Sequence, residues 1–107
     1  MKHYLFVESY PSHPTRVDEF NKWYEEIHIP EVVALDGFVG ATRLAPAAAD
    51  GGPFIVLYEL EGDPHEAERN VHAAAAAKQL NLSDALSLGP IPKMRIMQVQ
   101  SEYTKPR

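Results

Sequence analysis

The sequence predicts a small α+β protein in which helices cover one face of an antiparallel sheet. Its 107 residues give room for one domain. Strand-like and helix-like segments follow one another in the order β-α-β-β-α-β. Hydrophobic residues make up 45% and charged residues 23% of the chain, which is ordinary globular usage. We therefore expect residues 1–107 to form a single domain.

The first strand and the first helix are predicted near the N-terminus. Residues 3–10 are rich in β-branched and aromatic side chains and end at Pro11, which predicts a strand. Thr15 followed by Asp18 resembles a capping box and indicates a helix start. An apolar stripe at helical spacing follows, formed by Val17, Phe20, Trp23, Tyr24 and Ile27.

Pro30 disturbs this helix, because proline lacks an N–H and its ring opposes the preceding turn. We expect a break or kink near residues 28–30, then one or two further turns. Asp36-Gly37 ends the unit, with Gly37 as a left-handed cap.

Two more strands are predicted over residues 38–45 and 54–61, joined by an Ala- and Gly-rich link that suits a wide hairpin. Asp63 as N-cap and Pro64 at the first helical position predict a second helix, which runs to about Gln79.

A loop over residues 82–90 leads to a last strand over residues 93–103. With right-handed crossovers, this order of elements gives the ferredoxin-like βαββαβ arrangement, a four-stranded antiparallel sheet with two helices on one face.

The predicted strands are apolar on both faces. Tyr4 and Phe6 point to one side of the first strand, while Leu5 and Val7 point to the other. Two helices cover only one face, so the helix-free face needs another partner. We expect a homodimer that packs sheet against sheet, a dimeric α+β barrel. The alternative is ordinary exposed apolar surface.

Composition excludes several classes of function. The formal net charge is −5 and no segment concentrates Lys or Arg, which argues against nucleic-acid and membrane partners. The absence of cysteine removes disulfides, thiol nucleophiles and cysteine-type metal sites. No apolar run approaches the roughly 20 residues of a membrane helix, and no signal-peptide core is present, which predicts a cytoplasmic protein.

His28 is the most suggestive single residue. It borders the apolar stripe one turn after Tyr24 and lies three residues before Glu31. A histidine near aromatic rings and carboxylates is suited to general acid/base work at neutral pH. The structural alternative is a histidine that ends the helix and caps its carbonyl groups.

The segment 20–43 contains Trp23-Tyr24 followed by His28-Ile29-Pro30, then Gly37-Phe38 and a strand that ends near Arg43. This pattern resembles that of the EthD-like proteins of the dimeric α+β-barrel superfamily, which are named for ethyl tert-butyl ether degradation. The rest of the chain matches in topology and length. The resemblance implies a cleft between helices and sheet that His28 faces. Proteins of similar fold include polyketide cyclases, cofactor-independent monooxygenases and muconolactone isomerases, and many EthD-like proteins have no assigned reaction.

The walls of this cleft come from the helix-facing side of the sheet. If Tyr4 and Phe6 share that side with Phe54, Val56 and Tyr58, the cleft suits a flat, apolar ligand. A slip of one residue would exchange the faces, and plain core is the alternative. The candidate substrate-binding residues are Tyr4, Phe6, Trp23, Tyr24, Glu31, Arg43 and Tyr58. Arg43 would orient a carboxylate or enolate, or lie on the surface at a strand end.

Cofactor motifs are not found. His65, Glu68 and His72 share one side of the second helix, but the two histidines are two turns apart, so we expect a solvated face and no metal site. The sequence has no glycine loop that would cradle a phosphate and no nucleophile elbow. These observations predict a protein without a cofactor.

The leading hypothesis is a small cofactor-independent enzyme of the isomerase, cyclase, lyase or monooxygenase type. It would act on an aromatic or polyketide-like small molecule, with His28 as acid/base tuned by Glu31 or a tyrosine hydroxyl. One alternative is a non-catalytic binding or accessory protein for a hydrophobic metabolite. Another is a structural dimer whose barrel is filled by its own side chains.

Overall fold

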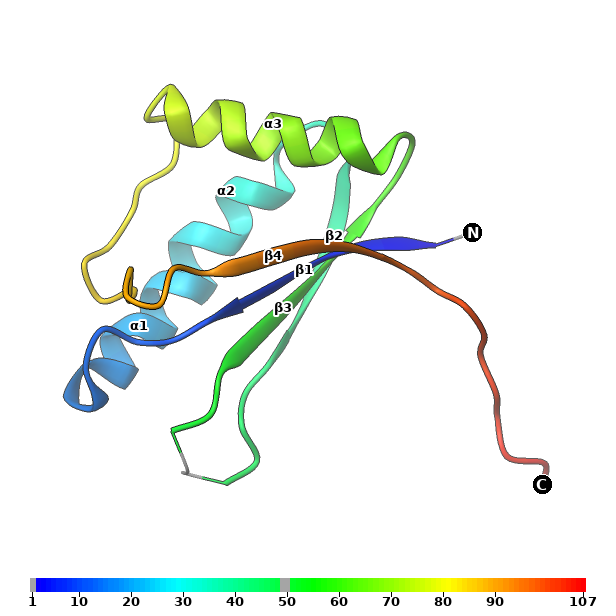
Figure 1. Ribbon diagram of the computed structural model, residues 1–107, viewed down its shortest axis with the longest axis horizontal. Coiled ribbons are helices and arrows are strands. Elements are labelled where there is room, and N and C mark those ends of the chain that lie inside the picture. The colour runs from blue at the N-terminus through cyan, green and yellow to red at the C-terminus, as the bar shows by residue number, and fades with distance from the viewer. Residues whose placement is uncertain (1, 49–50) are drawn as a thin grey trace.

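The computed structural model describes residues 2–48 and 51–107. A four-stranded sheet in the order β2-β3-β1-β4 pairs antiparallel throughout, and the helices lie on one side of it (Figure 1). The strands are β1 (His3–Ser9), β2 (Phe38–Leu44), β3 (Phe54–Leu60) and β4 (Lys93–Gln98). The predicted α+β class is confirmed, and the arrangement is compatible with a ferredoxin-like fold.

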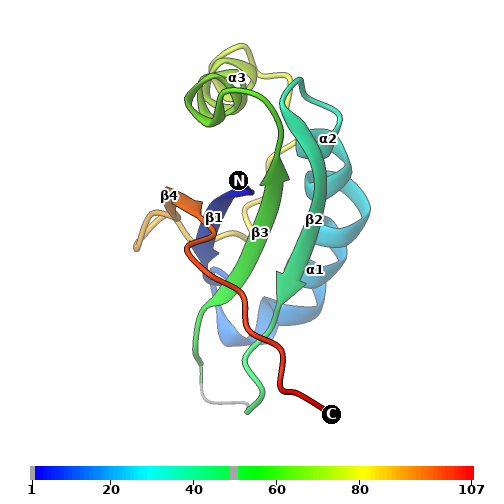
Figure 2. The ribbon, with the colours of Figure 1, turned by 90° about the vertical axis from the view of Figure 1, so that its right-hand side faces the viewer.

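Helical structure between β1 and β2 is continuous. A 3₁₀ turn, η1 (Pro14–Arg16), leads into α1 (Val17–Trp23), a π-helical turn η2 (Tyr24–His28) and α2 (Ile29–Val33). The second helical unit is α3 (Pro64–Ala76). Figure 2 shows α1 and α2 along one side of the sheet and α3 across one end of it.

A break or kink was expected near residues 28–30, and no break occurs there, because the helix widens into a π turn instead. The N–H of Ile29 donates to the carbonyl of Tyr24, five residues back, and the helix then continues past Pro30. A wide π turn just before a proline gives its ring room and leaves no amide unpaired at that point. The helix start also differs, because His13 accepts from the N–H of Thr15 and no side chain caps α1.

The phase expected for β1 is wrong by one residue. Leu5 lies opposite Tyr58 and is buried in the core, so Tyr4 and Phe6 point to the helix-free face. The helix-facing positions of β3 are as expected, at Phe54, Val56 and Tyr58. Because β1 is apolar at every position from Tyr4 to Val7, its side-chain alternation carries no information about which face is buried.

The core lies between the sheet and the helices. Its largest fully buried side chains are Leu5, Phe20, Tyr24, Val32, Val56 and Tyr58. Small residues of α3, Ala67 and Ala74 among them, let this helix approach closely. Asp63 caps α3 by accepting from the N–H of His65, as expected, and the left-handed Gly37 is also confirmed.

The last strand is shorter than expected. β4 ends at Gln98 rather than at residue 103, because β1 begins at His3 and offers no further partner after the bond from the Val99 N–H to the Lys2 carbonyl. The remaining residues extend away from the sheet (Figure 1). The link between β2 and β3 includes residues 49–50, which lie outside the described residues. Among the described helices, none has the length and apolarity to cross a membrane.

Candidate functional site

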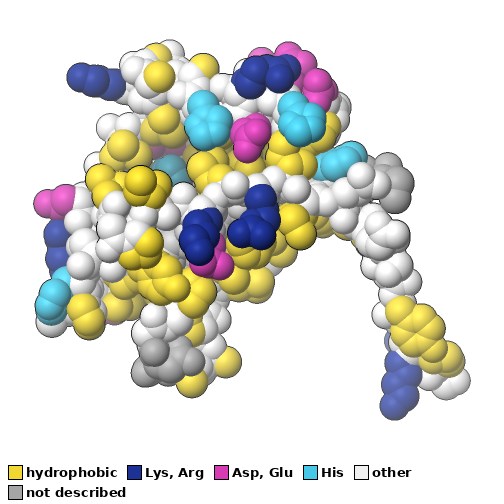
Figure 3. Space-filling model, in the orientation of Figure 1, with side chains coloured by type: hydrophobic (Ala, Val, Ile, Leu, Met, Phe, Trp, Pro, Cys, Tyr) yellow, Lys and Arg dark blue, Asp and Glu magenta, His cyan; other side chains and the backbone are white. Residues whose placement is uncertain are grey.

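A cavity of about 150 Å³ lies between the helices and the sheet. Most of its wall is aliphatic and comes from β1, α2, α3, β4 and the loop that joins α3 to β4. Four side chains of the wall carry polar groups, and these are Tyr24, His28, Tyr58 and His72. Figure 3 shows histidine side chains along the lower edge of α3, above a band of hydrophobic side chains between α3 and β4.

His28 enters this cavity from the π turn. Its ring stacks on Trp23 at a centroid distance of 4.6 Å and meets the Tyr24 ring edge-on at 5.2 Å. Its Nδ1 is buried and has no hydrogen-bond partner among the described residues. Burial lowers the pKa of His28 to about 4, although the Glu31 carboxylate acts in the opposite direction. The imidazole is therefore neutral at pH 7.

The two tyrosines of the cavity differ in their hydrogen bonding. The hydroxyl groups of Tyr24 and Ser9 share a buried hydrogen bond of 2.9 Å. The Tyr58 hydroxyl is also buried, yet it has no partner among the described residues. Burial raises the pKa of the Tyr58 hydroxyl, so this group stays protonated and is an unused donor.

Arg43 lies behind Tyr24 and not at the surface of the strand end. Its side chain is 12% exposed, and its guanidinium lies 4.8 Å from the ring centre of Tyr24 and 5.0 Å from that of Phe54. Nη2 donates to Asn21 Oδ1 at 2.8 Å. Burial lowers the pKa of this guanidinium. Arg43 is outside the cavity wall, so it supplies a positive charge beside Tyr24 and Tyr58 without reaching a ligand in the cavity.

Glu31 and Trp23 both bind the loop between α3 and β4. The Glu31 carboxylate accepts from the Asn81 backbone N–H at 2.9 Å and from its Nδ2 at 2.6 Å. The indole N–H of Trp23 donates to the Asn81 carbonyl at 2.7 Å. Neither Glu31 nor Trp23 belongs to the cavity wall. Trp23 instead supports the His28 ring from behind.

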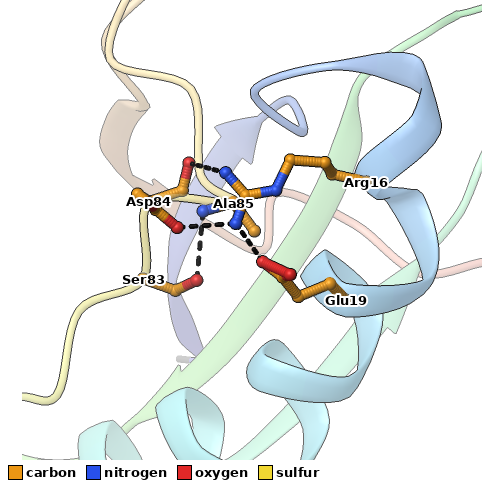
Figure 4. Close-up of polar contacts among 5 residues, drawn as sticks. All are labelled: Arg16, Glu19, Ser83, Asp84 and Ala85. Carbon is orange, nitrogen blue, oxygen red and sulfur yellow. Dashed lines mark hydrogen bonds and ion pairs between the residues drawn. The ribbon is translucent and has the colours of Figure 1, made fainter.

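A second set of contacts fixes the same loop further along. Arg16 donates to the carbonyl of Asp84 at 3.1 Å and to its carboxylate at 2.6 Å, while also contacting Glu19 (Figure 4). The buried Ala85 accepts from the Ser12 N–H at 2.6 Å. The loop is thus anchored at Asp84–Ala85, independently of Asn81.

The structure gathers three of the expected site residues, Tyr24, His28 and Tyr58, around one cavity. It places Tyr4 and Phe6 on the opposite face of the sheet, away from this cavity.

His72 is exposed, as expected for a solvated face of α3, but it also belongs to the cavity wall, which sequence analysis did not predict. A second residue that sequence analysis missed is Asn81. Asn81 lies in an irregular loop, and no sequence pattern points to its partners. Among the described residues, no group of three or more His, Asp or Glu side chains is placed to hold a metal ion.

A larger hollow among the described residues lacks this combination of groups. This hollow, of about 540 Å³ beside the β2–β3 hairpin, has no histidine, carboxylate or arginine among its described lining residues. The fold and the cavity thus define a small α+β protein with a neutral histidine in an apolar pocket. Comparison with models of protein families, with curated proteins and with solved structures finds no match for this chain.

Proposed function

We propose that this protein is a small cofactor-independent enzyme that moves a proton on a neutral, single-ring aromatic molecule, with His28 as the acid/base. One observation carries the proposal: the neutral His28 ring lies in the wall of an apolar cavity with an unpartnered Nδ1. Buried polar groups are almost always hydrogen-bonded, so an exception inside a cavity indicates a ligand-binding role.

The proposed chemistry is proton transfer at carbon next to a carbonyl group. His28 takes the proton, the C–H bond breaks, and its electron pair moves into an enolate. A neutral imidazole with a low pKa is a weak base, but the enolate that forms beside it favours the imidazolium and raises its basicity as the reaction proceeds. The Tyr58 hydroxyl is the available donor for the enolate oxygen. Return of the proton to a different atom completes an isomerisation.

The size of the cavity narrows the substrate. Ligand sites for drug-sized molecules usually measure about 300–1,000 Å³, whereas an apolar cavity of about 150 Å³ takes one benzene ring. The cavity beside His28 has about 150 Å³ and therefore fits a single ring in the conformation seen here. This supports a monocyclic substrate over a fused-ring polyketide.

Membership of the EthD-like family and the homodimer are part of the same proposal. The position of His28 between helices and sheet supports the family resemblance, which rests on residues 20–43. The apolar side chains on the helix-free face of the sheet, Tyr4 and Phe6 among them, support the dimer.

Deuterium uptake from D₂O into phenylacetone, a one-ring enolisable ketone, tests the proposed function. Purified protein should accelerate exchange at the benzylic carbon, and His28→Ala should remove about 10²–10⁴ of that acceleration, the usual contribution of a general acid/base. Tyr58→Phe should slow exchange while leaving the fold intact. His65→Ala is the matched control, because His65 is an exposed histidine of α3 outside the cavity wall.

The outcomes separate enzyme from binder. Unchanged exchange in a folded His28→Ala protein would remove His28 from the mechanism. Saturable binding of phenylacetone without exchange would instead support the alternative function, a binding protein for a small hydrophobic metabolite.

A further inference from the structure

A short loop segment, residues 80–83, lies between two hollows. On its inner side is the cavity of His28, of about 150 Å³. On its outer side is a surface groove of about 550 Å³, lined by Trp23, Glu26 and Ile27 from the first helical unit. Leu82 belongs to the walls of both hollows and is 67% exposed. Displacement of this one segment would therefore join the groove and the cavity.

Polar contacts of Asn81, together with the packing of Leu80 against the core, hold the segment in place. Asn81 is exposed. Its backbone N–H and Nδ2 donate to the two oxygens of the Glu31 carboxylate, and its carbonyl accepts from the Trp23 indole N–H. We call these contacts the Asn81 clasp. Segments with few buried apolar contacts are the ones that open locally at low free-energy cost. In this segment Leu82 is 67% exposed, and Leu80 is the one apolar side chain that packs against the core.

The chain on both sides of the segment is fixed. Before it, the N–H of Gln79 donates to the Ala74 carbonyl at the end of α3, after Lys78 in a left-handed conformation with φ of 58°. After it, Arg16 holds Asp84 (Figure 4), and the Ser12 N–H donates to the Ala85 carbonyl. Opening is thus confined to a few residues and leaves the rest of the fold in place.

We propose that the Asn81 clasp keeps the ligand site closed. Glu31 is then a positioning residue that controls access to His28 and the orientation of its ring. This inference rests on the proposed function only in naming the cavity as the ligand site. Release of the clasp joins the groove to the cavity, so that molecules larger than one ring can reach His28. The Asn81 clasp is therefore a determinant of substrate size.

The Asn81 clasp also acts on His28 through Trp23. The indole is held from one side by the Asn81 carbonyl and stacks on the imidazole with an interplanar angle of 23°. Closing the segment fixes the indole, which in turn restricts the imidazole to one orientation. Glu31 thus acts on His28 through Asn81 and Trp23, in addition to its charge.

Trp23 is the single tryptophan of the chain and reports on the Asn81 clasp without any substrate. It is 6% exposed, so acrylamide should quench its fluorescence poorly in the wild-type protein. Glu31→Gln removes the charge from the clasp, and Asn81→Asp replaces the Nδ2 donor with a second carboxylate facing Glu31. Since a hydrogen bond to a charged group contributes about tenfold or more to an opening equilibrium, both variants should raise acrylamide quenching and speed amide exchange in residues 80–83 by about tenfold.

Glu26→Gln is the matched control, because Glu26 is an exposed carboxylate of the same groove without a hydrogen bond or ion pair to a described side chain. It should leave quenching and exchange unchanged. The Glu31→Gln protein should also bind 1-naphthol, a two-ring probe, more tightly than the wild type does.

The proposal would be overturned if folded Glu31→Gln and Asn81→Asp proteins showed the quenching and amide exchange of Glu26→Gln. Acrylamide quenching and amide exchange do not depend on catalysis. They therefore still test the proposal if the protein fails to accelerate deuterium uptake into phenylacetone. Increased quenching with unchanged 1-naphthol binding would also contradict the proposal, since the opened segment would then not lead to the ligand site.

Discussion

At the level of single residues, the decisive feature is the balance of forces on His28. Burial opposes the imidazolium, while the Glu31 carboxylate favours it, and burial is the larger effect. The Glu31 oxygens also accept two hydrogen bonds from Asn81. His28 is therefore neutral in the cavity, because the effect of burial on its pKa exceeds the opposite effect of the Glu31 carboxylate.

The low pKa of His28 predicts a loss of stability in mild acid. The pKa of His28 is about 4 in the folded protein and 6.5 in the unfolded chain. Between these two pH values the unfolded chain therefore binds a proton at His28 that the folded protein does not bind. The free energy of unfolding should fall as pH drops from 6.5 and level off near 4, by roughly 3 kcal/mol in total from this group. Urea unfolding at several pH values, compared with His28→Phe, isolates the contribution. Parallel pH profiles for the two proteins would contradict the burial of a neutral His28.

At the level of elements, the sequence predicted those features that depend only on residues adjacent in the chain, such as helix caps. The N-cap at Asp63 and the left-handed Gly37 depend on neighbours in the chain, and both are found in the structure. The phase of β1 depends on which of two apolar faces meets the helices, a tertiary choice that alternation does not encode.

In the candidate site too, contacts between residues close in sequence were predictable, whereas contacts between distant residues were not. His28 and Tyr24 share one helical unit, so their proximity follows from spacing. Asn81 reaches Glu31 and Trp23 across 50 and 58 residues of sequence, through a loop without periodicity. Contacts of this kind arise only when the whole chain has folded, so no local pattern could have indicated them.

Close approach of two elements makes Gly37 irreplaceable. It has a φ of +94°, and a Cβ there would lie 2.8 Å from the Ala67 Cβ and 3.2 Å from its Cα in α3. Gly37→Ala should lower the free energy of unfolding by about 2–4 kcal/mol, through backbone strain and overpacking together. Gly62→Ala, at φ of +70° with open space around it, should cost only the strain of about 1 kcal/mol. Thermal unfolding distinguishes the two variants, and equal losses would mean that α3 moves away without cost.

At the level of the whole molecule, the helix-free sheet face is the feature that a single chain does not explain. Phe6 and Leu57 lie opposite each other near its centre, and Met97 on β4 is 48% exposed. Glu8 on β1 pairs with Lys93 on β4 in register, so both signs of charge occur on the same face. Arg95 on β4 pairs with Phe6, and its guanidinium lies 5.8 Å from the centre of that ring, so apolar side chains and an arginine share the middle of the face. A two-fold axis would bring this surface against itself.

We predict that the protein is a dimer through this face at micromolar concentration. A standard interface takes about 800 Å² from each partner, a modest part of the 7268 Å² surface of the chain. Leu57→Arg adds a second positive charge to the middle of the face, where Phe6 lies between Leu57 and Arg95. It should give a folded monomer, since a desolvated unpaired charge costs more than the contact gains. Leu88→Arg is the control, because Leu88 is 72% exposed in the loop before β4. Light scattering should give twice the 12.0 kDa chain mass for the wild type and for Leu88→Arg. A wild-type protein that remains at 12.0 kDa under these conditions would leave the apolar sheet face without a partner copy and refute the dimer.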